Sequence, residues 1–173
     1  MRYMPFLLLL LMVVACVKEP IGSYDEAGVI EIGSDTAEVL FNVPDTDSIL
    51  PGWTPWGDGE ATKTLTLTFK EKGGLDVSIT TVYWVFYNVD GDQVASDYID
   101  FLPPLEVLAR GQETYDLSVT VDEVIANNLD DHDGSPDDFS GTGTIRFMVS
   151  GFDRHWGNAI NDIPSYTPMR VAK

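Results

Sequence analysis

Alternation of apolar and polar residues with a period of two is the feature that most limits how this chain can fold. It recurs in short segments, among them 37–43, 64–70, 115–121 and 144–150. Because successive side chains of a β-strand point to opposite faces, this pattern predicts strands with one buried face. The segment 77–87 is apolar on both faces in its second half, which predicts a strand in the middle of a sheet.

Turn residues separate these strands. Asp90-Gly91 follows the segment 77–87 and precedes a further strand pattern at about 94–101. An Asp-Gly pair between two strand patterns is a strong hairpin signal. Pro103-Pro104 is predicted to end the second strand of that hairpin, because proline breaks the hydrogen-bond ladder.

The C-terminal part of the chain predicts one short helix and one last strand. Thr120 and Glu123 match a capping box, which predicts a helical turn or two near 121–128. The last strand is expected within 159–171, where Pro164 and Pro168 interrupt it. Proline within a sheet is confined to edge strands, so this strand is predicted at an edge.

About seven short strands and little helix predict an all-β chain folded as an antiparallel β-sandwich. A resemblance supports this fold class. Trp84 in a central strand, the Asp90-Gly91 turn, and the segment 140–147 entering a late strand resemble strands C, C′ and F of immunoglobulin-like or fibronectin-type-III-like domains. The resemblance covers about residues 35–171 and implies a single immunoglobulin-like sandwich over 31–173. It implies a fold and no function, since such sandwiches host many unrelated roles.

The N-terminus predicts export. Residues 1–15 contain one arginine, a short apolar run and a small residue, which is the order of a secretory signal peptide. The run is too short to span a bilayer, which takes about 20 residues. Residues 13–16, Val-Val-Ala-Cys, resemble the lipobox of bacterial lipoproteins, which implies lipidation at Cys16. Residues 16–30 then form a tether, and the alternative is a signal peptide without lipidation.

This resemblance also bears on location. A lipidated Cys16 places the protein at the cell envelope, attached to the membrane through its N-terminal lipid. Val17 after it is uncharged. Enteric lipoproteins with Asp at that place are retained in the inner membrane, so the resemblance favours the outer membrane if the organism has two membranes.

The charge of the chain limits its partners. With 28 acidic and 10 basic residues the formal net charge is −18. Affinity for nucleic acid rests on Lys and Arg, so no nucleic-acid partner is expected. The acidity also suits a protein that works in high salt or binds cations, but solubility alone is the simpler explanation.

The segment 130–138 is the best candidate metal site. Asp131, Asp133 and Asp137 surround Gly134 in a pattern that resembles the start of a calcium loop. Ca²⁺ takes several oxygen ligands, which carboxylates in a turn can provide. The pattern departs from the EF-hand, because Leu129 and Ser140 stand where ligands are expected. The alternative is a solvated acidic loop without Ca²⁺.

Two tryptophans in a polar loop are the best candidate ligand-binding residues. Trp53 and Trp56 lie among Pro, Gly and Thr residues. Rings in such loops stack on sugars, and Trp is favoured at binding hot spots. The alternative is that both rings fold back and cap one end of the sandwich.

Catalytic motifs are missing from the sequence. Its two histidines, His132 and His155, are far apart, and no nucleophile elbow, zinc-protease or phosphate-loop motif occurs. Asp153 and His155 offer a possible dyad, although a polar loop explains them. We therefore expect no enzyme, but a lipid-anchored envelope protein with a non-catalytic binding or structural role. The expected partner is an envelope protein, and the alternative is a glycan bound by Trp53 and Trp56.

Overall fold

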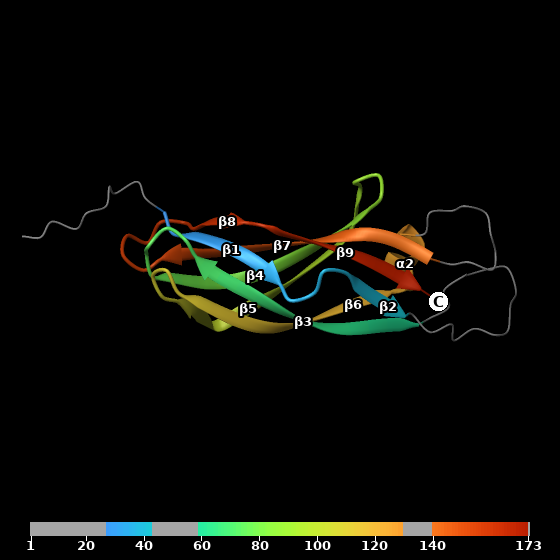
Figure 1. Cartoon of the computed structure of the whole chain (residues 1–173), viewed down its shortest axis with the longest axis horizontal. Helices are drawn as coiled ribbons and strands as arrows, with labels where there is room; N and C mark the ends of the chain where they lie inside the picture. Colours follow the sequence, from blue (N-terminus) through green and yellow to red (C-terminus); the bar gives the residue numbers. More distant parts are fainter. Residues whose placement is uncertain (1–26, 43–58, 130–139, 173) are drawn as a thin grey trace, which may run out of the picture.

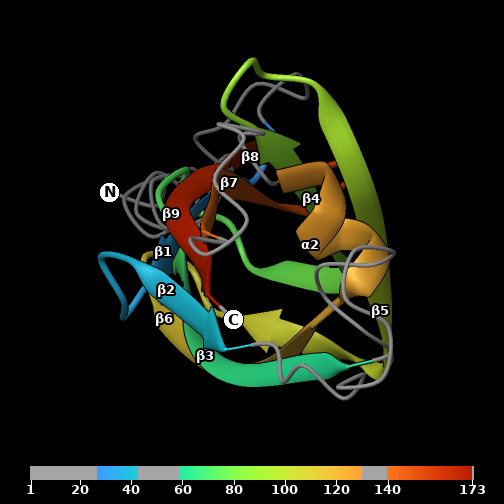
Figure 2. The same ribbon diagram turned by 90° about the vertical axis from the view of Figure 1, so that its right-hand side faces the viewer.

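The computed structural model describes residues 27–42, 59–129 and 140–172. Within these ranges the chain forms two β-sheets packed face to face and one short helix (Figures 1 and 2). The elements are β1 (Val29–Ser34), β2 (Val39–Asn42), β3 (Glu60–Glu71), β4 (Val77–Asn88), β5 (Gln93–Val107), β6 (Gln112–Asp122), α2 (Glu123–Leu129), β7 (Ser140–Asp153), β8 (Asn161–Ile163) and β9 (Ser165–Ala172).

The strand order identifies the type of sandwich. One sheet has the order β6-β3-β1-β8 and the other β2-β9-β7-β4-β5. Strands A, B and E of an immunoglobulin-like domain correspond to β1, β3 and β6, and strands C′, C, F and G to β5, β4, β7 and β9. The predicted all-β, immunoglobulin-like sandwich is therefore confirmed, including the predicted places of strands C, C′ and F.

The prediction of purely antiparallel sheets is wrong in two places. β1 pairs with β8 in parallel, and β2 pairs with β9 in parallel. Both pairings join an N-terminal strand to a C-terminal strand, so no hairpin dictates their direction. The local alternation that predicted the strands carries no information about such long-range partners.

Proline in β5 does not end the strand, contrary to the prediction. Pro103 and Pro104 lie between the paired residues Asp100 and Leu105, where the register with β4 shifts. β5 is an edge strand, so one side of it needs no ladder partner and proline is tolerated there. The strand therefore continues to Val107.

The last strand is not at an edge, which is a second correction. Pro164 separates β8 from β9, and the chain changes from one sheet to the other at this residue. β9 lies between β2 and β7. Pro168 is tolerated inside it because the pairing with β2 begins only at Met169.

The core lies between the two sheets and consists of the inward residue of each alternating pair. In β3, Leu65, Leu67 and Phe69 are buried, as the sequence pattern predicts. β4 lies between β7 and β5, which confirms its central position. The largest fully buried side chains are Phe41, Phe69, Phe86, Phe147, Ile30, Leu67, Ile79, Leu117, Leu129, Ile145 and Met169.

Buried carboxylates hold the turns at the end of the sandwich where β1 begins (Figure 1). Glu71 accepts hydrogen bonds from the N–H groups of Gly74 (2.7 Å) and Arg110 (2.9 Å), which joins two turns. Asp153 is fully buried and accepts from the N–H groups of His155 (3.1 Å) and Asn158 (2.8 Å). These carboxylates satisfy backbone donors that no strand partner reaches.

Candidate functional site

All site residues predicted from the sequence lie outside the described residues. These are Cys16, Trp53, Trp56, Asp131, Asp133 and Asp137. Lipidation, sugar stacking and calcium binding therefore stay predictions. The structure does describe the elements next to the segments 43–58 and 130–139. β2 ends at Asn42 and β3 begins at Glu60, while helix α2 ends at Leu129. All three points lie at the end of the sandwich opposite to the start of β1 (Figure 1).

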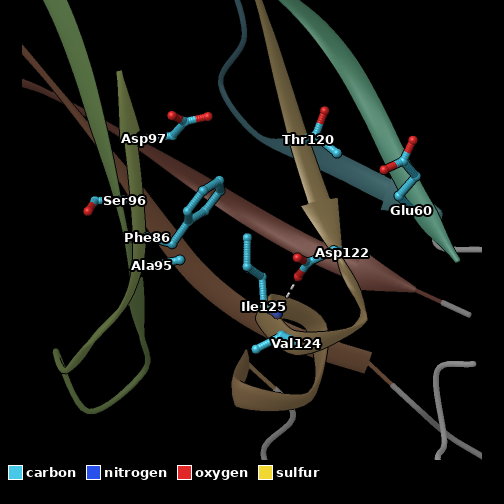
Figure 3. Close-up of a pocket in the computed structure, with 9 residues that line it drawn as sticks. All are labelled: Glu60, Phe86, Ala95, Ser96, Asp97, Thr120, Asp122, Val124 and Ile125. Carbon is cyan, nitrogen blue, oxygen red and sulfur yellow. Dashed lines mark hydrogen bonds between the residues drawn. The ribbon is translucent and has the colours of Figure 1, made fainter. Parts of the chain in front are cut away.

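A pocket of about 360 Å³ opens at this same end, between the edges of the two sheets (Figure 3). Its volume lies in the range of small-ligand pockets, roughly 300–1,000 Å³. β4 and β5 contribute one wall, and β3, β6 and α2 contribute the other. The lining residues are Glu60, Phe86, Ala95, Ser96, Asp97, Thr120, Asp122, Val124 and Ile125.

The centre of the pocket is apolar. Phe86 points inward from β4 and is 1% exposed, and its cross-strand partner on β5 is Ala95. Ile125 of α2 points toward the Phe86 ring from the opposite wall (Figure 3). Val124 is 59% exposed at the opening. A ligand in this pocket would therefore contact mainly the aliphatic carbons of Val124 and Ile125, because the Phe86 ring beneath them is already covered.

Three carboxylates are among the residues that line the pocket, and the lining includes no basic side chain. Asp97 lies opposite Trp84 in the β4–β5 pairing, a position that faces the inside of the sandwich at its open edge. Glu60 is the first residue of β3. Asp122 is the last residue of β6, and its carboxylate accepts a hydrogen bond of 2.9 Å from the N–H of Ile125. The pocket thus favours a positively charged group attached to an apolar one.

The hydrogen bond from Ile125 also corrects the predicted helix cap. α2 begins directly after Asp122, so Asp122 is the N-cap residue and Ile125 the third helical residue. The capping box predicted at Thr120 is wrong. Thr120 still belongs to strand β6, and its hydroxyl lies 2.8 Å from the Thr62 hydroxyl of β3.

The possible dyad of Asp153 and His155 is a turn. The Asp153 carboxylate accepts a hydrogen bond from the backbone N–H of His155, and the His155 ring packs edge-on against the Trp156 ring at a centroid distance of 4.1 Å. This favours the polar-loop alternative. In the described part of the chain, no group of three or more His, Cys, Asp or Glu side chains is arranged to hold a metal ion. The described segments also include no helix that is long and apolar enough to cross a membrane.

The sequence did not predict this pocket. Its residues come from five elements between positions 60 and 125, and only the folded sheets bring them together. One signal was present at Asp97, where a carboxylate stands at an inward position of an alternating strand. An inward-pointing charge of this kind is typical of an edge strand or of the lining of a site.

Comparison with known proteins gives a likeness of fold alone. No protein-family model matches this chain, and no curated protein matches its sequence. A protein from Archaeoglobus fulgidus has a TM-score of 0.44 at 8% identity, over 82% of this chain and 94% of that one. The CARDB domain of a Pyrococcus furiosus protein, solved in complex with di-metal ions, has a TM-score of 0.38 at 11% identity, over 87% and 93%. A human ASH/PapD-like domain has a TM-score of 0.33 at 13% identity, over 91% and 92%.

Proposed function

We propose that this protein is a lipid-anchored protein of the cell envelope whose sandwich binds a partner without catalysis. The observation that carries the proposal is the placement of the pocket. It opens at the end of the sandwich opposite to Ala27, where the described chain begins (Figure 1). An anchor at Cys16 would therefore attach the end held by Glu71 and Asp153 and leave the pocket on the remote side. The lipobox-like residues 13–16 support that anchor.

The chemistry of the pocket suggests what the partner presents. Its ionisable lining groups are Glu60, Asp97 and Asp122, all of which are acidic. A Lys or Arg side chain combines a cation with an apolar stem, and the stem would lie against Val124 and Ile125. Arg fits best, because its planar guanidinium can pair with a carboxylate through two hydrogen bonds. The proposed partner is an envelope protein that inserts such a side chain.

Titration of the mature chain with N-acetylarginine amide, followed by amide NMR, tests this proposal. The shifts should concentrate on Ala95, Asp97 and Ile125. Asp97→Asn and Asp122→Asn should each weaken binding about twofold to fivefold, as expected for an exposed ion pair of about 0.4–1 kcal/mol. Asn is a good N-cap, so the second variant keeps α2 intact.

Asp100→Asn is the matched control. Asp100 lies on the same strand as Asp97 but on the outer face, where it accepts a hydrogen bond from the Thr81 hydroxyl (2.7 Å). This variant should bind as the wild type does. Equal losses in all three variants would indicate a general effect of net charge and would contradict the pocket as the site.

The alternative function is a carbohydrate-binding module that uses Trp53 and Trp56. Its support is that β2 ends and β3 begins at the end of the sandwich that carries the pocket, so both strands lead toward that end (Figure 1). A Ca²⁺ bound by Asp131, Asp133 and Asp137 would lie in the segment that joins α2 to β7, which also leave from this end.

A further inference from the structure

The two outer faces of the sandwich differ in chemistry. On the sheet of β3 and β6, Lys70 and Asp116 lie among outward positions that mostly carry small hydroxyl side chains: Thr62, Thr64, Thr66, Thr68, Thr114, Ser118 and Thr120. On the opposite sheet, the outward positions of β5, β4, β7 and β9 include large rings and chains, which we call the tyrosine face: Tyr83, Val85, Tyr98, Arg146, Met148 and Tyr166. Asp100 and the hydroxyls of Thr81, Ser96 and Thr144 lie beside them. Threonine has a high β-propensity and is well suited to the exposed face of a strand. The need for β-propensity therefore does not by itself explain why tyrosines occupy the other face.

The register places these side chains next to one another. Tyr83 on β4 is opposite Tyr98 on β5 and Met148 on β7. In the adjacent row, Arg146 on β7 is opposite Val85 on one side and Tyr166 on the other. Directly opposite residues on neighbouring strands have Cβ atoms about 4.5–5.5 Å apart, so the rows form one continuous surface.

The rings stand in solvent. Tyr98 is 63% exposed and Tyr166 is 59% exposed. The Arg146 guanidinium carbon lies 5.6 Å from the centre of the Tyr166 ring, so the ring and the cation position each other. The Nε atom of Arg146 is buried and makes no hydrogen bond, so only the terminal amino groups of the guanidinium could serve a ligand. The face therefore combines exposed rings with a cation held beside one of them.

The charge of the face limits what can bind it. Among the six residues of the tyrosine face the charged side chain is Arg146, with Asp100 beside it on the same outer surface, on a chain with a formal net charge of −18. A second copy would bring the same large negative charge, and most anionic macromolecules would be repelled too. An uncharged polymer is not repelled. Its hydroxyl oxygens would meet Arg146 and the neighbouring Ser96 and Thr144 hydroxyls.

We propose that the tyrosine face binds a neutral polysaccharide strand, with sugar rings stacked on Tyr98 and Tyr166 and sugar hydroxyl oxygens accepting hydrogen bonds from Arg146. This site shares Ser96 with the rim of the pocket but does not include its apolar centre, and it is separate from Trp53 and Trp56. It rests on the contrast between two faces of one molecule and does not depend on the proposed function.

Affinity electrophoresis of the mature chain in native gels tests this site, with dextran, a galactomannan and a xyloglucan as soluble probes. At least one probe should retard the wild type. Tyr98→Ala and Tyr166→Ala should weaken that retardation at least tenfold, and Tyr98→Trp, which keeps a ring, should preserve it. Thr64→Ala on the opposite face is the matched control and should behave as the wild type.

Three results would overturn the proposal. The first is that no probe retards the wild type. The second is that a Trp53→Ala/Trp56→Ala double variant loses retardation while Tyr98→Ala keeps it, which would place sugar binding in the loop. The third is a dimer by sedimentation that Tyr98→Ala dissociates, which would make a second copy the occupant of the face.

Discussion

At the scale of single residues, Glu71 is the carboxylate whose loss should matter most for stability. It is 1% exposed and accepts hydrogen bonds from the N–H groups of Gly73 (2.6 Å), Gly74 (2.7 Å) and Arg110 (2.9 Å). Glu71→Gln replaces one acceptor oxygen with an amide that faces these donors. A hydrogen bond to a charged group contributes about 1.5–3 kcal/mol, so we expect a loss of about 2–3 kcal/mol in urea unfolding.

The stabilisation by Glu71 should also depend on pH. Burial alone would raise its pKa, but the backbone N–H groups of Arg110, Gly74, Gly73 and Val29 stabilise the charged form and lower the pKa below its usual value. A group with a lowered folded-state pKa stabilises the fold above its unfolded pKa, about 4.3, and loses this effect as the pH falls through the folded value. The difference between wild type and Glu71→Gln should therefore be largest near pH 7 and shrink in acid.

The matched control for this prediction is Glu38→Gln. Glu38 pairs with Arg170 at 3.0 Å, and both side chains are more than half exposed. Exposed pairs contribute about 0–1 kcal/mol, so this variant should unfold almost as the wild type does. A similar loss in both variants, or a constant difference across the pH range, would contradict the role assigned to Glu71.

At the scale of elements, the pairing of β4 with β7 depends on a glycine. Gly151 is opposite Ile79, at the point where the register shifts before Thr81. A Cβ at Gly151 would collide with the carbonyl oxygen of Ser78 and lie 2.9 Å from the Cα of Ile79. Both neighbours are backbone and cannot rotate away, so Gly151→Ala should destabilise the protein by about 1–3 kcal/mol in urea unfolding.

Gly33→Ala on β1 is the comparison that isolates this effect. The nearest atom to its added Cβ is the Cβ of Thr68, at 3.8 Å, which is an ordinary contact. Replacing such a glycine restricts the unfolded chain, so the variant should be as stable as the wild type or slightly more. If Gly151→Ala were equally harmless, the close approach of β4 and β7 would be wrong.

The same elements show how much of the fold was predictable from the sequence. Alternation located β3, β4, β6 and β7 because each has one face in the core, and Asp90-Gly91 located the hairpin between β4 and β5. β1 was not predicted, because its sequence is short, includes Gly33 and shows little alternation of apolar and polar residues. The parallel pairings and the internal place of β9 depend on contacts between distant segments, which no local pattern encodes.

At the scale of the whole molecule, the candidate site was less predictable than the fold. The pocket forms where two sheet edges and α2 meet, and the tyrosine face needs the register of four strands. Neither has a motif. The predicted residues Trp53, Trp56, Asp131, Asp133 and Asp137 were chosen by local composition, which points to chemistry but not to an arrangement in space.

The prediction for the whole molecule is that Cys16 decides where it resides. Several acyl chains on one residue hold a protein stably on a membrane, whereas one chain binds only marginally. The wild type should therefore fractionate with membranes, with an intact mass that begins at Cys16 and includes added acyl chains. Cys16→Ser removes the thiol and should lose both the added mass and the membrane fraction, while Val17→Ala should keep them. An unlipidated wild-type mass in the medium would contradict the anchor and make the sandwich a diffusible binding domain, with both its pocket and its tyrosine face free of any membrane.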